Sequence, residues 1–186
     1  WWEYDPSTNS WTQKVDYPGN NGNGELGAHG IGMESVGFVG LGEINDYALY
    51  KYDPALNTWT QMTSPVTSGT FQDTGDFTIG SKAYFIKISS TEFWEYDTAL
   101  DQWTQKGNVP FTGYFSFSGF AINGKGYTKV SNFPATINEF WEYAPTLDTW
   151  SAKTPCPGYA LLSSAAFVQN NKGYVVCGYG RANGLT

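Results

Sequence analysis

A segment of 14 residues occurs four times in this chain, and no other feature of the sequence constrains the fold as strongly. Every copy contains a tyrosine and, seven residues later, a tryptophan. Successive tyrosines are 48, 44 and 47 residues apart. A period of roughly 40 to 50 residues is typical of folds that stack one unit or repeat it radially. The four pairs are Tyr4 and Trp11, Tyr52 and Trp59, Tyr96 and Trp103, and Tyr143 and Trp150.

Each copy of the segment predicts a β-hairpin. In the third copy Glu95 separates Trp94 from Tyr96, so the two rings share one face of a strand and the carboxylate takes the other. Asp5 and Asp53 each precede a proline and predict the turn, because the carboxylate accepts N–H groups ahead of it while proline presets φ. The return strand is expected to begin at the tryptophan. Just before it we expect a residue at positive φ, namely Asn9, Asn57, Asp101 or Asp148.

A second hairpin is predicted between successive copies. Its turns are Gly80-Ser81, Asn123-Gly124 and Asn170-Asn171, and Asn-Gly is the strongest two-residue hairpin signal. The first of these hairpins, at about 29–42, is shorter and interrupted by glycines. Each repeat then has two inner strands and an outer Tyr/Trp hairpin, and four strands per repeat make a propeller blade.

The sequence therefore predicts an all-β β-propeller of four repeats, as a single domain over residues 1–186. The expected parts are an outer hairpin at 1–14, blades at about 27–62, 70–106 and 113–153, and an inner hairpin at 159–180.

The two ends of the sequence are complementary, since it opens on an outer hairpin and closes on an inner one. Joining them places Tyr4 47 residues after Tyr143, which matches the other periods. The strand around Trp2–Asp5 is expected to pair with the strand around 174–179, because an open edge would expose unpaired backbone and aromatic surface. Within one chain this pairing closes a ring. Between chains it links copies head to tail, into a larger propeller or a filament.

The repeated segment resembles the kelch motif, most closely the bacterial form N-x-F-W-E-Y-D-P-x-x-N-x-W-T-x-K. The resemblance covers essentially the whole chain, and the Tyr-to-Trp spacing in all four copies makes it specific. Two family features are missing: the arginine before the innermost strand, and the Gly-Gly pair, whose nearest remnants are Gly40 with Gly42 and Gly178 with Gly180. The resemblance implies a β-propeller that binds partners through its loops. Any ligand role of the missing arginines does not transfer.

One histidine and one arginine limit the chemistry of this chain. His29 alone can form neither a histidine-rich metal site nor a histidine-based triad, and galactose oxidase, a kelch relative, needs two histidines for copper. Kelch-like sialic acid mutarotases depend on arginine, and this chain has only Arg181. The loop at 20–25 has oxygen ligands that Ca²⁺ could use, but a flexible linker is the simpler interpretation. No cofactor or metal is predicted, and His29 is expected to be structural or simply exposed.

The carboxylates do not predict a hydrolytic pair. Glu3, Glu95 and Glu142 recur at one blade position, so we expect them to point apart on a solvated face. A glycosidase pair must converge to within about 5–10 Å. Asp73 and Asp76, near an inner strand, could converge and are kept as the minor alternative of a sugar-active enzyme. The chain is otherwise expected not to be an enzyme.

Charge and hydropathy exclude several partners. The net charge is −7 and no basic stripe exists, which argues against nucleic acid and against an anionic membrane surface. No apolar run is long enough to span a bilayer. Because the sequence begins with two tryptophans and no methionine, we expect a processed chain or a fragment.

Aromatic residues make up 18% of the chain, and most are expected to pack between blades. Rings in the loops of one propeller face are candidates for contact with a protein or a glycan, since loops on a rigid scaffold commonly carry binding. The candidates are Tyr17, Tyr47, Phe111, Tyr114, Phe133, Tyr159, Tyr179 and Arg181. The first functional hypothesis is a non-enzymatic extracellular or cell-surface binding module. The second is a homo-oligomeric structural subunit that self-assembles head to tail by sharing blade strands.

The two cysteines leave a disulfide open. With a turn at 170–171, Cys177 lies opposite Ser164 rather than Cys156, so a Cys156–Cys177 bond would require the loop at 155–158 to fold back. Two cysteines without a CxxC pattern indicate neither a zinc site nor a compartment.

Overall fold

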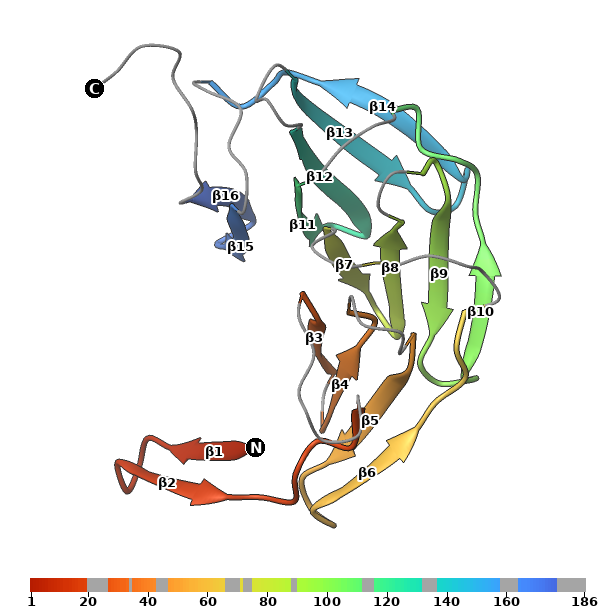
Figure 1. The fold of residues 1–186 in the computed structure, drawn as a ribbon. Coiled ribbons are helices and arrows are strands. Elements are labelled where there is room, and N and C mark those ends of the chain that lie inside the picture. Colours follow the sequence, from red (N-terminus) through yellow and green to blue (C-terminus); the bar gives the residue numbers. More distant parts are fainter. Residues whose placement is uncertain are drawn as a thin grey trace, which may run out of the picture. The chain divides into compact units, whose positions relative to one another are not determined.

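The computed structural model describes residues 1–19, 27–33, 35–42, 47–65, 71, 75–87, 90–111, 116–131, 137–157 and 164–176. These residues form sixteen β-strands and no α-helix, which confirms the all-β prediction (Figure 1). The chain divides into two compact units, Trp1–Pro65 and Val66–Thr186. That the two form one domain stays a prediction.

The first unit consists of one hairpin and one complete sheet. The hairpin pairs β1 (Trp2–Asp5) with β2 (Ser10–Gln13) as a two-stranded sheet. The complete sheet has four antiparallel strands in chain order: β3 (His29–Met33), β4 (Val36–Gly40), β5 (Leu49–Asp53) and β6 (Thr58–Gln61).

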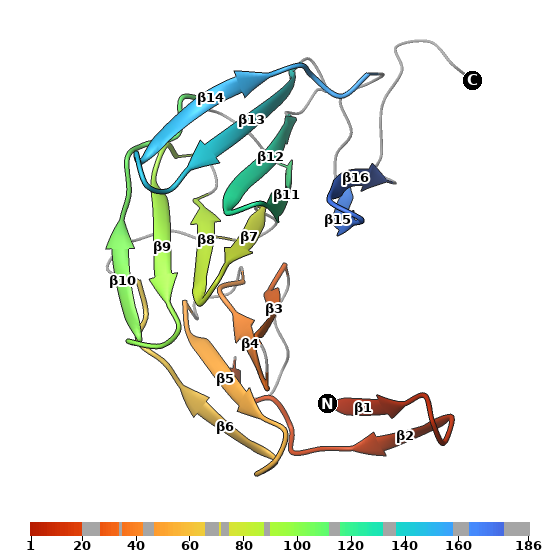
Figure 2. The ribbon, with the colours of Figure 1, turned by 180° about the vertical axis from the view of Figure 1, so that it is seen from behind.

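The second unit contains two complete sheets and a further hairpin (Figure 2). The first sheet has the strands β7 (Asp76–Ile79), β8 (Lys82–Ile86), β9 (Phe93–Asp97) and β10 (Gln102–Gln105). The second has β11 (Ser116–Ile122), β12 (Lys125–Ser131), β13 (Asn138–Ala144) and β14 (Thr149–Lys153). The hairpin pairs β15 (Ala165–Gln169) with β16 (Lys172–Val176). Among the described residues, three sheets therefore have the four antiparallel strands of a blade.

Local sequence determines the turns. Asn123 and Gly124 have φ of 52° and 72°, as a type I′ hairpin requires, and Asn170 and Asn171 repeat this with 50° and 59°. The positive φ predicted in the outer hairpins is present at all four positions, with 51° at Asn9, 52° at Asn57, 53° at Asp101 and 52° at Asp148.

The first turn residue of the outer hairpins acts as predicted. Asp5, Asp53 and Asp97 each accept, through Oδ1, the N–H group two residues ahead, at 2.8, 2.9 and 3.0 Å. In the fourth copy Ala144 replaces the aspartate, and its carbonyl accepts the N–H of Leu147 at 3.2 Å instead. The return strands begin one residue earlier than predicted, because the residue before the tryptophan already pairs across the hairpin. These first residues are Ser10, Thr58, Gln102 and Thr149.

The main core lies in the second unit and draws on both of its complete sheets. Its buried members are apolar or aromatic: Phe77, Tyr84, Ile86, Phe93, Val109, Phe111, Val130 and Tyr143. Trp141 and Trp150 pack against this cluster from β13 and β14. Because burial of one large apolar side chain contributes about 1.5–3 kcal/mol, this cluster is a major source of stability.

A small residue faces the repeated tyrosine in every complete sheet. The pairs are Gly37 with Tyr52, Ala83 with Tyr96, and Gly126 with Tyr143. A Cβ at Gly126 would overlap the ring of Phe77 on β7. Glycine is therefore needed there for the two sheets of the second unit to approach each other.

Candidate functional site

The repeated segment builds one side-chain cluster four times, named here the Tyr–Trp–Asx cluster. The tyrosine lies directly opposite the tryptophan across the hairpin. Their ring centroids are 5.0, 4.8, 4.8 and 5.0 Å apart in chain order. The tyrosine hydroxyl donates to Oδ1 of the Asn or Asp at positive φ, at 2.8, 2.9, 2.8 and 2.7 Å. The members are Tyr4, Asn9 and Trp11; Tyr52, Asn57 and Trp59; Tyr96, Asp101 and Trp103; and Tyr143, Asp148 and Trp150.

The segment after one outer hairpin docks on the cluster of another. The Val15 N–H donates to Oδ1 of Asn57 at 3.1 Å, and Nε1–H of Trp59 donates back to the Val15 carbonyl at 3.2 Å. In the second unit Gly107 stands at the equivalent position, and its N–H donates to Oδ2 of Asp148 at 2.9 Å. The Asx residue thus also ties successive repeats together, a role that the sequence pattern did not indicate.

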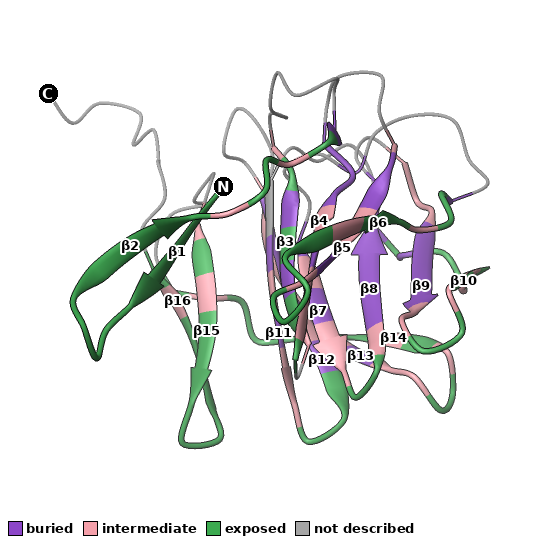
Figure 3. Ribbon diagram, turned by 90° about the horizontal axis from the view of Figure 1, so that it is seen from below, coloured by how far each residue is buried: buried purple, intermediate pink, exposed green. Residues whose placement is uncertain are grey.

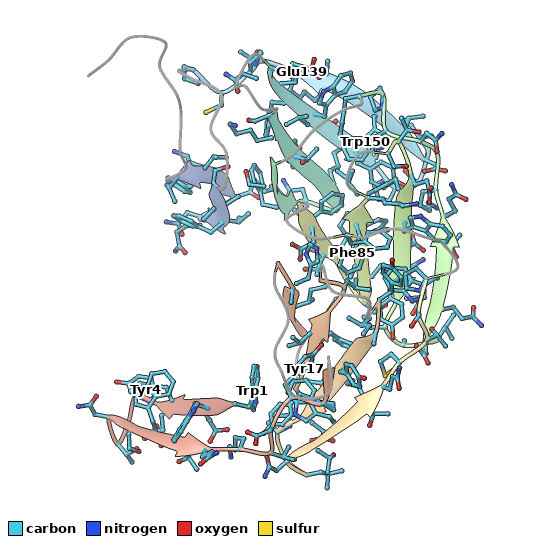
Figure 4. All side chains as sticks on the ribbon, in the orientation of Figure 1. Trp1, Tyr4, Tyr17, Phe85, Glu139 and Trp150 are labelled. Carbon is cyan, nitrogen blue, oxygen red and sulfur yellow. The ribbon has the colours of Figure 1, made fainter. Side chains whose placement is uncertain are left out.

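The first residue of one outer hairpin covers the next cluster. Trp1 contacts the rings of Tyr52 and Trp59, with centroids 5.6 and 5.2 Å apart, and Figure 4 shows it close to β5. Phe93 holds the same place in the third copy and contacts both rings of the fourth cluster, with centroids 4.7 and 5.0 Å apart. The second and fourth clusters are therefore each covered by a ring and a linker from the preceding copy.

The first cluster is not buried in this way. Tyr4 is 44% exposed and Trp11 65%, whereas Tyr52 is 6% exposed and Tyr143 0%. This burial, followed by the bond to Asp148, raises the pKa of Tyr143 above its ordinary value. Most residues of the hairpin β15–β16 are also exposed (Figure 3). Both of its strands carry large apolar side chains that are exposed. We call β1–β2 and β15–β16 the terminal hairpins; the exposed apolar surface of each makes it a candidate contact site.

A glutamate held by two lysines is the second repeated device. Nζ of Lys125 donates to Oε1 of Glu142 at 2.9 Å, and Nζ of Lys153 lies 3.2 Å from the same oxygen. The hydroxyl of Tyr127 donates to Oε2 at 2.9 Å. The Lys125 ammonium lowers the pKa of Glu142 to about 2. This carboxylate is therefore charged at all ordinary pH values and joins three strands.

The prediction of a solvated face for these glutamates is wrong in two of the three copies. Glu95 is buried, and Lys82 and Lys106 contact its two carboxylate oxygens. The side chain of Glu142 is only 12% exposed. The reason is that lysines from both neighbouring strands fold over the carboxylate. Glu3 is still 48% exposed, with Lys14 at 3.1 Å.

The predicted loop contacts are only partly described. Tyr17 packs edge-on against Tyr50 and Trp59, with centroids 5.4 and 5.2 Å apart, and Tyr47 is half-buried. Phe111 is a buried member of the core and presents little surface to a ligand. The remaining candidates lie outside the described residues: Tyr114, Phe133, Tyr159, Tyr179 and Arg181.

The structure describes some of the other chemically active side chains. His29 is buried at the start of β3 opposite Gly40, and Asp76 lies in β7 opposite Phe85. Cys156 is a free cysteine. The described residues contain no group of three or more His, Cys, Asp or Glu side chains that could hold a metal ion. Asp73, Cys177 and the loop at 20–25 lie outside the described residues.

A buried lysine on β12 is a feature that the sequence pattern did not predict. Lys129 on β12 is almost fully buried, and its Nζ donates to Oγ of Ser131. Desolvation lowers the pKa of Lys129. A lysine within an alternating strand is ordinarily expected to face solvent, so the pattern carried no signal for it.

In the part of the chain that the structure describes, no helix has the length and apolar character needed to cross a bilayer. No family model and no curated protein matches the chain. Among solved structures it is similar to the structure of YjhT, with a TM-score of 0.69 and 16% sequence identity. The likeness covers 82% of this chain and 58% of that one, so this chain spans little more than half the length of that neighbour. Such a likeness shows the fold alone: an all-β chain of four-stranded antiparallel sheets of the blade type.

Proposed function

We propose that this chain is a non-enzymatic β-propeller module of the kelch type that works by contact with another protein, outside the cell or at its surface. Its four repeats supply three complete blades and the two halves of a fourth. The likeness to YjhT supports the blade fold. The Tyr–Trp–Asx cluster, present in every repeat, supports the assignment to the kelch type.

One observation carries the proposal: a cluster that is buried in the second and fourth repeats is exposed in the first. Nothing in the local sequence of the first copy explains this difference, since its cluster has the same internal geometry. Contiguous exposed aromatic surface commonly marks an interaction site. The terminal hairpins are therefore where a partner would bind.

A protein fits this surface better than other partners. Within the described residues, neither terminal hairpin pairs with a third strand. An added strand from a protein would satisfy the backbone groups on such an edge. A glycan is the second candidate, because Trp2 and Trp11 are both exposed and sugar rings stack on such indoles. A glycan would use the rings but leave the strand edges unpaired.

The test compares Trp11→Ser with the matched control Leu100→Ser, since both side chains are 65% exposed on outer hairpins. Solution mass by light scattering detects association of the chain with itself. Immobilised arrays of secreted proteins and glycans detect other partners. We expect binding that Trp11→Ser abolishes and Leu100→Ser preserves. Unchanged binding by Trp11→Ser, or the absence of any binding by the wild-type chain, would contradict the proposal.

A further inference from the structure

We propose that β16 of one copy of this chain pairs with β1 of a second copy, so that the two terminal hairpins complete one four-stranded sheet shared between copies. This inference rests on the proposed contact function and names its partner. The complete sheets within the chain show what each half lacks. In all three, two inner strands precede an outer hairpin. Among the described residues, β15–β16 forms an inner pair without an outer hairpin, and β1–β2 forms an outer hairpin without an inner pair.

The register of the shared sheet follows from the complete sheets. The second residue of each second inner strand is Gly37, Ala83 or Gly126, and it pairs with the repeated tyrosine. Gly173 is the second residue of β16. A Cβ at Gly173 would overlap the ring of Phe120, as one at Gly126 would overlap Phe77. Gly173 should therefore pair with Tyr4 of the second copy.

The charges on the two halves complement each other in this register. Lys82 and Lys125 are the first residues of β8 and β12, and each contacts the glutamate that precedes the repeated tyrosine. Lys172 is the first residue of β16. Glu3 precedes Tyr4 and is bridged to the outer-strand lysine Lys14. Within the described residues, neither Glu3 nor Lys172 has the remaining partner, and the shared sheet would bring them together.

Pairing would also cover the exposed first cluster. Phe140 stands in the fourth copy where Trp1 and Phe93 stand in theirs. Thr154 likewise follows its outer hairpin as Val15 and Gly107 follow theirs. By the geometry of those copies, Phe140 would cover the rings of Tyr4 and Trp11 of the second copy. The Thr154 N–H would donate to Asn9 Oδ1.

A second copy is the occupant that we favour over the chain's own end. The fold of YjhT extends well beyond the part that this chain matches, since the chain covers 58% of it. The described residues of one copy form three complete sheets, and pairing of β16 with β1 of the same copy would add a fourth. Propellers typically have about 4 to 8 blades. A self-closed chain would be at the lower limit, whereas two copies joined at both junctions would have twice as many sheets.

Disulfide trapping tests the register and the occupant together. In a Cys156→Ser, Cys177→Ser background, one full-length copy carries Trp2→Cys and the other Val175→Cys. These positions face each other when Gly173 pairs with Tyr4. Opposite Cα atoms in an antiparallel pair are about 4.5–5.5 Å apart, which a disulfide can bridge. We expect mild oxidation of the mixture to give a heterodimer, identified by mass spectrometry.

The matched control replaces Trp2→Cys by Ser7→Cys, which lies in the exposed turn at the far end of the same hairpin. It should give no heterodimer, and equal trapping with both cysteines would overturn the register. A chain that carries both Trp2→Cys and Val175→Cys tests the alternative occupant. If it crosslinks only within itself, the ring closes in one chain and the second copy is overturned. If no pair crosslinks, the shared sheet is overturned, while the binding test of Trp11→Ser still decides the proposed function.

Charge reversal gives a second readout without removing a ring. Glu3→Lys and Lys172→Glu should each weaken association of the chain with itself in light scattering. In a mixture of the two variants, one junction brings the two reversed residues together as an ion pair. The mixture should therefore associate more strongly than either variant alone. Association that is equally strong in every sample would contradict the proposed pairing of Lys172 with Glu3.

Discussion

The first and fourth outer hairpins contain the same cluster in different surroundings. In both, the tyrosine and tryptophan centroids are 5.0 Å apart. The tyrosine hydroxyl lies 2.8 Å from Oδ1 of Asn9 in the first and 2.7 Å from Oδ1 of Asp148 in the fourth. Yet Tyr4 is exposed, while Tyr143 is fully buried beneath Phe93. The cluster therefore forms without being buried.

This difference shows that the interactions that form the cluster are distinct from the burial that makes it stabilise the fold. Its contacts join residues within one hairpin, so the local sequence is enough to form them. A hydrogen bond of a tyrosine exposed to water contributes little net free energy, because water competes for both partners. When the tyrosine is buried, loss of the bond carries the full desolvation penalty of the hydroxyl. Substitutions at matched positions of an exposed and a buried cluster test this difference.

Removal of the repeated tyrosine should give the largest difference. Tyr143→Ala should reduce the free energy of unfolding by about 3–5 kcal/mol, as for other buried aromatic residues. Tyr4→Ala should cost less than about 1 kcal/mol in dilute solution, as is usual for exposed positions. Urea unfolding measures both. Equal losses of unfolding free energy would show that burial does not decide how much the cluster stabilises the fold. A loss for Tyr4→Ala that grows with protein concentration would support the shared sheet.

Two glycines that face the repeated tyrosine should respond differently to alanine. Gly126→Ala should cost about 1–3 kcal/mol, because its Cβ would overlap the buried ring of Phe77. Gly37→Ala places its Cβ 3.9 Å from the Ile31 carbonyl, an ordinary contact, and should be close to neutral. Thermal unfolding of both variants checks this. A neutral Gly126→Ala would show that the sheets of the second unit can move apart freely.

Glycine in place of the Asx residue isolates the side-chain bonds, since glycine retains the positive φ. Asp148→Gly should cost about 1–3 kcal/mol, because it leaves the buried Tyr143 hydroxyl without its acceptor. Asn9→Gly should cost only a few tenths of a kcal/mol, because water replaces the acceptor of the exposed Tyr4. Similar unfolding midpoints in urea for the two variants would contradict this.

The smallest effect should appear in acid. The folded-state pKa of Glu142 is lowered from 4.5 to about 2, so its stabilising contribution is complete above pH 4.5 and is lost as the pH falls through 2. Glu142→Gln should remove this part of the acid sensitivity. It should also lower Tm at pH 7 by about 2–4 °C, corresponding to about 1 kcal/mol. An identical slope of Tm against pH in the variant and the wild type would show that another group is responsible.

Short-range features were predictable from the sequence because their causes lie within a few residues. The Asp turns, the positive φ at Asn9 and its equivalents, and the type I′ turn at Asn123-Gly124 follow from neighbouring side chains and backbone. The small residue opposite each tyrosine was visible in the sequence, but its meaning depends on the strand register. The solvated face expected for Glu95 was wrong, because its lysine partners come from other strands.

The candidate site was likewise predictable from the sequence only in part. The sequence placed the complementary hairpins at the two ends of the chain, but it offered loop aromatics as the contact residues. Phe111 became part of the core, since only packing decides whether a ring near a loop faces inward. Tyr4 and Trp11 were expected to pack, but both are exposed, because burial of a ring depends on what other parts of the fold place over it.

The sequence by itself determined the repeat, the all-β class, the hairpins with their turns and the internal geometry of each Tyr–Trp–Asx cluster. All of these arise from interactions between residues close together along the chain. The tertiary structure alone decided which clusters are covered and which glutamates are enclosed by lysines. Burial depends on what a neighbouring repeat places over a surface, and four nearly identical segments cannot encode four different neighbours.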